Sequence, residues 1–210
     1  MLEIISESYL NVTPYGAWRA TAHAENTSER QTLQAILREP VSPLLTQENA
    51  RAWTSEASTE QALEQLLRLQ ENACLEAWSA PRTAPLESLE ISLPPLLAAL
   101  SDTHQAVLAD RMGFCLAVAG YPIDQGEALA ALGADILSVA DRQTVALSKL
   151  GDQLLDGWGN VDAAGISGLS FWPMHVGRVR LALAVRGRPR FNQACFAELV
   201  WSLCVRYGQI

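Results

Sequence analysis

Five arginines near the C-terminus form the densest group of side chains in this sequence that could bind a partner. A guanidinium keeps its charge and donates several hydrogen bonds in a fixed fork, so it suits an acidic protein surface or a phosphate. The simpler alternative is a set of solvated strand ends and a charged loop, because arginine is the ordinary base of this chain. The candidate partner-binding residues are Arg178, Arg180, Arg186, Arg188 and Arg190.

No motif of a hydrolase is complete. Gly165-Ile166-Ser167-Gly168 begins like the G-x-S-x-G nucleophile elbow, but Leu169 stands where the last glycine is required. Histidines are few and scattered, which favours neither a metal site nor a Ser-His-Asp triad. They are His23, His104 and His175. We therefore expect no catalytic residue and no enzyme activity.

Nucleotide-binding motifs are also incomplete. The single lysine, Lys149, is followed by Leu150, whereas a P-loop needs lysine inside G-x-x-x-x-G-K-[ST]. Gly157-Trp158-Gly159 opens like a dinucleotide loop, but Asp162 occupies the place of the third glycine. The sequence predicts that this chain is not itself a P-loop GTPase or ATPase and that it holds no cofactor.

The cysteines are too far apart to form a typical zinc site, which draws its thiolates from close pairs. None belongs to a C-x-x-C pair, so we expect buried thiols and no metal. They are Cys74, Cys115, Cys195 and Cys204.

Composition and charge indicate a globular cytoplasmic protein. Apolar residues make up 49% of the 210 and charged residues 18%. No apolar run reaches the roughly 20 residues of a membrane span, and residues 1–7 hold two glutamates and no base, unlike a signal peptide. Residues 1–100 carry thirteen glutamates against six arginines, a net charge of −7. Since phosphate backbones repel acidic surfaces, we expect no nucleic-acid partner and no membrane partner.

Residues 1–85 predict a small α+β module. Glu3 to Val12 and Ala17 to His23 are interpreted as a hairpin around Pro14-Tyr15-Gly16. Helices are expected to follow up to Leu37 and over Leu44 to Trp53.

A stronger helix signal comes next in this module. Ser58-Thr59-Glu60-Gln61 has the capping-box pattern, and Cys74 to Trp78 suits a short strand. The arrangement leaves a winged-helix-like module open, used for DNA or for protein contact. The second helix carries Glu60, Glu64 and Glu71 against Arg68 alone. Such an acidic surface disfavours DNA. Pro81 to Pro85 reads as a linker, which divides the chain into domains 1–85 and 86–210.

Residues 86–210 predict a sheet crossed by helices. A short helix opens at Ser92-Leu93-Pro94-Pro95, a hairpin spans Val107 to Ala119, and a long helix runs from Asp124 to Leu150. A strand over Val176–Arg186 and a final helix capped by Asn192 follow, while residues 154–172 remain ambiguous.

The small side chains of this domain suggest how the long helix packs. The face formed by Cys115, Ala117 and Ala119 is expected to receive that helix. Leu129, Leu132, Ile136 and Val139 form one stripe along the helix, and Ala128, Ala131 and Ala134 lie beside it.

This order of elements resembles the roadblock / dynein light chain family over a little more than half the chain. The resemblance is carried by Ala109-Asp110-Arg111-Met112-Gly113-Phe114, Ala117-Val118-Ala119-Gly120, Glu127 to Ala134, Leu181 to Val185 and the closing helix after Asn192. Pro94 and Pro95, and Trp158, Trp172 and Pro173, depart from the pattern.

The resemblance implies an antiparallel sheet of five strands with helices on both faces and pairing into homodimers. It also implies a non-catalytic adaptor or regulator. In bacteria such proteins commonly regulate or scaffold small Ras-like GTPases. The alternatives are a signal-responsive transcriptional regulator with an N-terminal winged helix, and a ligand-sensing domain with a pocket beside Trp158 and Trp172. Fold analogy alone does not decide among these functions.

Overall fold

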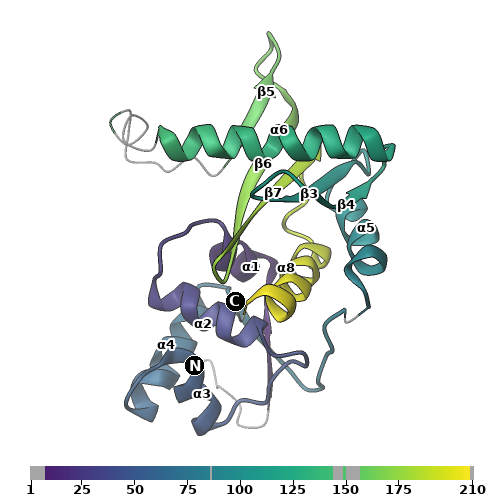
Figure 1. Cartoon of the computed structure of the whole chain (residues 1–210). Coiled ribbons are helices and arrows are strands. Elements are labelled where there is room, and N and C mark those ends of the chain that lie inside the picture. Colours follow the sequence, from purple (N-terminus) through teal and green to yellow (C-terminus); the bar gives the residue numbers. More distant parts are fainter. Residues whose placement is uncertain (1–7, 86, 144–148, 150–156, 209–210) are drawn as a thin grey trace. The chain divides into compact units, whose positions relative to one another are not determined.

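The computed structural model describes residues 8–85, 87–143, 149 and 157–208 (Figure 1). Its contacts form two compact units. Unit 1 comprises residues 1–86, 176–178 and 191–210, and unit 2 comprises residues 87–175 and 179–190. The closing helix therefore packs in unit 1, although the sequence analysis counts it with residues 86–210. The division into domains 1–85 and 86–210 stays a prediction about which segments fold alone.

Unit 1 begins with a strand and a helix, so the predicted second strand of a hairpin at Ala17–His23 is wrong. β1 (Tyr9–Val12) pairs antiparallel with β2 (Leu75–Trp78), which is far away in sequence. Between them α1 (Pro14–Thr21) starts at once, because the Thr13 hydroxyl accepts from the Gly16 amide at 3.0 Å. Pro14 stands in the first helical turn, where its missing amide costs nothing. The turn residues expected for a hairpin thus serve as a helix start.

Three capped helices follow, as the sequence predicts. They are α2 (Ser28–Leu37), α3 (Gln47–Thr54) and α4 (Thr59–Glu71). Each begins after a hydroxyl residue whose oxygen accepts a backbone amide three positions on. These residues are Thr27, Thr46 and Ser58. Such a cap stabilises a helix by about 1 kcal/mol.

The closing helix α8 (Ala194–Tyr207) completes the core of unit 1 and contacts α1 and α2. Its Phe196 is fully buried and stacks on Phe191, with ring centroids 4.9 Å apart, beside Trp18. The predicted cap, Asn192, is wrong: Gln193 occupies the cap position and makes no side-chain cap bond.

Unit 2 contains a five-stranded antiparallel sheet, as expected. In sheet order its strands are β4 (Cys115–Ala119), β3 (Ala106–Asp110), β7 (Val179–Arg186), β6 (Ser167–Val176) and β5 (Trp158–Val161). The segment left ambiguous by the sequence supplies β5 and most of β6. The predicted strand Val176–Arg186 is two strands: Val176 ends β6, and Gly177, with φ near +55°, turns the chain into β7.

Helix α5 (Leu89–Ala99) contacts β4 and β3. It starts three residues before the predicted Ser92, because the Ser88 carbonyl already accepts from the amides of Ile91 and Ser92, each at 2.9 Å. Pro94 and Pro95 therefore lie inside the helix, where they remove two backbone donors.

A β-bulge decides which face of β4 meets the long helix α6 (Ile123–Arg142). The β3–β4 register slips between Leu108 and Ala109, so Cys115 pairs with Ala109 and Val118 with Val107. A one-residue slip reverses the faces of the residues beyond it. Cys115 and Val118 consequently pack toward α6, and the expected face of Cys115, Ala117 and Ala119 is wrong.

Helix α6 lies across one face of the sheet and contacts β3, β4 and β7 (Figure 1). Its buried residues are Gly126, Ala130, Gly133 and Leu137. Leu129 and Ile136 of the predicted stripe are partly buried against the same cluster, whereas Leu132 and Val139 are exposed. A Cβ at Gly126 would lie 2.8 Å from a Val118 methyl carbon. The glycines thus let the helix backbone approach the sheet. The helix ends at Arg142, earlier than the predicted Leu150; residues 144–148, 150 and the expected cap Gly151 lie outside the described residues.

Candidate functional site

The five candidate arginines do not form one patch. Arg178 precedes β7 and belongs to unit 1, whereas the other four belong to unit 2. Within unit 2, Arg180 and Arg186 are six residues apart along one strand, a separation of roughly 20 Å. The arginines at the two ends of β7 therefore belong to separate surfaces.

Arg180 is held by its own chain. It forms an ion pair with Asp141 and donates through Nη2 to the Leu137 carbonyl at 2.9 Å. Both partners lie in the last turns of α6, where a cation complements the partial negative charge of the helix end. The structure thus places the Arg180 guanidinium against the end of the long helix.

The loop after β7 presents three arginine side chains on a well-held backbone. Asp102 accepts from the Arg188 amide at 2.8 Å, and the Thr103 hydroxyl donates to the Arg186 carbonyl at 3.1 Å. The side chains of Arg186, Arg188 and Arg190 are exposed. These three residues are the part of the predicted cluster that remains presented to a partner.

The middle of the outward face of α6 carries few charges. Leu132 and Val139, two turns apart on the same side of the helix, are 45% and 41% exposed. Between Ala128 and Val139 the only charged residue is Asp135. A solvated helix usually carries charges on its outer face. This composition favours coverage by another surface.

Two tight turns at the sheet hold further apolar side chains in solvent. Asp110 accepts from the amides of Met112 and Phe114, at 2.8 and 2.9 Å. Asp162 accepts from the amides of Ala164 and Ile166 at the same two distances. Glycines with positive φ complete both D-x-x-G turns.

The exposed residues at these turns lie next to the two edge strands. Phe114 is 70% exposed, Met112 72%, Ile166 65% and Val161 64%. Only the first of these turns is predicted above, although Asp162 and Gly165 repeat the spacing of Asp110 and Gly113. The second turn joins β5 to β6, and among the described residues β5 is an edge strand of the sheet.

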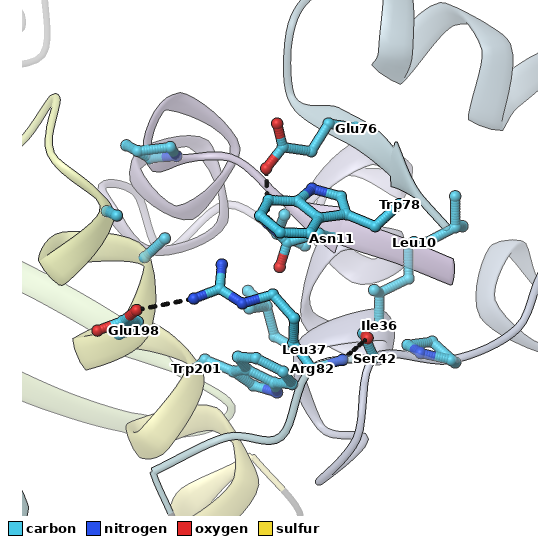
Figure 2. Close-up of a pocket in the computed structure, with 15 residues that line it drawn as sticks. Leu10, Asn11, Ile36, Leu37, Ser42, Glu76, Trp78, Arg82, Glu198 and Trp201 are labelled. Carbon is cyan, nitrogen blue, oxygen red and sulfur yellow. Dashed lines mark hydrogen bonds and ion pairs between the residues drawn. The ribbon is translucent and has the colours of Figure 1, made fainter. Parts of the chain in front are cut away.

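Unit 1 contains a small cavity around Arg82, with a volume of about 150 Å³ (Figure 2). Arg82 donates to Glu198 at 3.1 Å, and its guanidinium lies 4.8 Å from the centroid of the Trp78 ring. Its backbone amide donates to the Ser42 hydroxyl at 2.7 Å. Ligand pockets usually measure about 300–1,000 Å³. This cavity is smaller, and its cation is already paired, so we assign Arg82 to holding the 81–85 segment in unit 1.

The sequence and the structure were compared with known proteins. No protein-family model matches the sequence, and a search of curated proteins finds no match. Among solved structures, the chain is similar to the crystal structure of a Roadblock/LC7 domain from Streptomyces avermitilis. The sequence identity is 17% and the TM-score is 0.37, over 57% of this chain and 95% of that chain.

The thiols do not suggest chemistry. Burial raises the pKa of Cys74 to about 11 and the pKa of Cys204 to about 12, and it also raises the pKa of Cys115. These groups stay protonated at neutral pH, whereas the thiolate is the nucleophile and the metal ligand. Within the described ranges, no three His, Cys, Asp or Glu side chains come together as a metal site.

The two tryptophans proposed to flank a ligand pocket are close to buried structure. Trp158 packs against the cluster beneath α6, which includes Phe171 and Leu137. A Cβ at Gly157 would lie 2.6 Å from the Trp172 ring.

Among the helices that the structure describes, none combines the length and apolar character needed to cross a membrane.

Proposed function

We propose that this protein is a non-catalytic, homodimeric adaptor or regulator that binds proteins through unit 2. The observation that carries the proposal is the exposed apolar stripe of α6, with Leu132 and Val139, in a sheet whose edge strand β5 is open. Exposed apolar surface of this kind usually marks a protein interface. An unpaired strand edge is also a surface that native proteins cover or pair.

A second copy of this chain is the occupant that we propose for the α6 stripe. Pairing equivalent β5 edges across a two-fold axis satisfies the free amides and carbonyls of both subunits at once. Val161 and Ile166, at the end of β5 and in its turn, add apolar surface to the same edge. The two α6 helices then lie over the joined sheet with their lightly charged faces together.

The further partner that we propose is a small Ras-like GTPase. The resemblance carried by the Asp110–Gly113 turn and the alanine-rich helix implies this class. Since Lys149 lacks a P-loop context, nucleotide hydrolysis would belong to the partner. The exposed Arg186, Arg188 and Arg190 suit an acidic patch on such a partner.

Capture from native lysate tests the identity of the partner. The bait is the tagged full chain, and the matched bait carries Arg186→Gln, Arg188→Gln and Arg190→Gln. We expect a P-loop GTPase to be enriched on the first bait and reduced about tenfold on the second, because rim charges contribute to association. Specific enrichment of proteins without a P-loop on the first bait would contradict the GTPase assignment while leaving the dimer intact.

A further inference from the structure

Helix α2 presents a row of polar side chains to a hollow in unit 1. Arg30, Gln34 and Arg38 are spaced four residues apart, so they lie along one side of the helix. The hollow measures about 740 Å³, and Trp53 of α3 and the Gly177–Arg178 turn also line it. Its volume falls in the range of about 300–1,000 Å³ that is usual for small-molecule sites.

The turn that carries Arg178 is fixed by two side chains of α2. The Gly177 amide donates to Gln34 Oε1 at 3.1 Å, and Gln34 Nε2 donates to the Ala20 carbonyl at 2.7 Å. Arg30 Nη2 lies 3.5 Å from the Gly177 carbonyl. Gly177 has φ near +55°, which favours glycine. The backbone of the turn is therefore held while the Arg178 side chain stays exposed.

Positive charge gathers in this hollow. Three guanidiniums line it, those of Arg30, Arg38 and Arg178, and none of the described lining residues is a carboxylate. This contrasts with the excess of acids in residues 1–100. Burial lowers the pKa of Arg30, and the neighbouring charge of Arg38 lowers it further. Like charges placed together in a partly buried site favour binding of an anion.

The side chain of Arg38 has an unsatisfied polar atom, which is a second feature typical of a binding site. Its Nε is buried and has no hydrogen-bond partner among the described residues. Leaving a buried polar group without a partner is costly, so such groups often point to an ion or ligand.

We propose that this hollow binds a small, multiply charged oxyanion of the phosphate class, with Arg38 and Arg178 as direct ligands. A phosphoryl group carries about two negative charges and three acceptor oxygens, which match converging guanidiniums. Gln34 is a positioning residue, because it fixes the turn that carries Arg178. The proposal concerns unit 1 and does not depend on the dimer proposed for unit 2.

Calorimetric titration of the full chain with inorganic pyrophosphate tests the proposal. Arg38→Gln and Arg178→Gln each remove one guanidinium at the edge of the hollow, while the buried Arg30 is left intact. We expect the wild-type chain to bind and each variant to bind about tenfold more weakly, since a charge-assisted hydrogen bond is lost. Arg111→Gln changes an exposed arginine of unit 2 outside the proposed partner surface, so it is the matched control and should alter the affinity by less than about twofold.

Circular dichroism melting shows whether each variant is folded before its titration is interpreted. Citrate is the second probe, because it carries several carboxylates and no phosphoryl group. Citrate binding about tenfold weaker than pyrophosphate binding supports the phosphate class, and equal or tighter citrate binding overturns it. The site is also overturned if the wild-type chain gives no binding heat at millimolar pyrophosphate, or if Arg111→Gln weakens binding as much as Arg38→Gln.

Discussion

Helices α8 and α6 use their side chains in opposite ways. Seven of the fourteen residues of α8 are buried, including Phe196 and Trp201. Only four of the twenty residues of α6 are buried, and two of these are the glycines Gly126 and Gly133. Yet α6 is also poor in charge across its middle.

The difference between α8 and α6 shows which apolar side chains are covered by folding of the chain itself and which are left exposed. In α8 the bulky apolar side chains meet a core within unit 1, so this helix is explained by folding alone. In α6 the small residues face the sheet, and larger ones such as Leu132 and Val139 face outward. An apolar surface that folding leaves uncovered is available for association.

The largest expected effect is a loss of stability when a buried aromatic side chain, rather than an exposed one, is removed. Phe196→Ala should lower the free energy of unfolding by about 4 kcal/mol, because it empties a site in the core of unit 1. Phe114→Ala is the matched change at a 70% exposed position and should alter it by less than about 0.5 kcal/mol. Urea unfolding measures both. Equal losses would show that Phe114 is needed for the fold rather than free for a partner.

A second pair of variants tests the orientation of α6. Gly126→Val should destabilise the protein by about 1–3 kcal/mol, because even a Cβ here meets Val118. Ala128→Val places a similar side chain on the exposed face and should cost only about 0.5 kcal/mol, the ordinary helix-propensity difference. Thermal unfolding compares them. A more damaging change at Ala128 would mean that the inward and outward faces are reversed.

A smaller effect is expected in alkaline solution. Burial raises the pKa of Cys204 from 9.0 to about 12, so the unfolded chain loses this proton before the folded chain does. Above pH 9 the free energy of unfolding should therefore fall by up to about 1.4 kcal/mol per pH unit from this group. Cys204→Ala should make the decline between pH 9 and 12 less steep, and the raised pKa of Cys74 accounts for part of what remains. An unaltered slope in Cys204→Ala contradicts this assignment.

The smallest expected effect is DNA binding by helix α4. The exposed side of α4 carries acids, and its Arg68 is paired with Glu64 at 2.5 Å. We expect no sequence-selective binding at physiological salt, because an acidic helix is repelled from a groove. A sub-micromolar, sequence-selective gel shift would support the transcriptional-regulator alternative and contradict this prediction.

Local signals predicted much of the fold. The Ser58 cap and the Asp110–Gly113 turn depend on residues close in sequence, and the structure confirms both. The sequence suggests a hairpin turn at Pro14-Tyr15-Gly16, although threonine followed by proline is also a pattern that starts helices. The choice between the two depended on β2, which pairs with β1 from more than sixty residues away.

Other features could not be predicted because they depend on register and on distant packing. A β-bulge at Leu108/Ala109 decided which face of β4 meets α6, and Gly126 and Gly133 let the helix backbone approach the sheet. The i, i+4, i+8 row of Arg30, Gln34 and Arg38 is visible in the sequence. That this row lines a hollow together with Arg178 could not be predicted, because Arg178 is about 140 residues away in sequence.

Light scattering at tens of micromolar tests the homodimer most directly. The account predicts a mass near twice 22.8 kDa for the wild-type chain. The double variant Leu132→Asp and Val139→Asp should dissociate at least about thirtyfold more readily, because it places carboxylates in the apolar stripe. Ile91→Asp, at an exposed position of α5, should remain dimeric. A wild-type mass of 22.8 kDa that does not change with concentration would contradict the homodimer and the role proposed for α6.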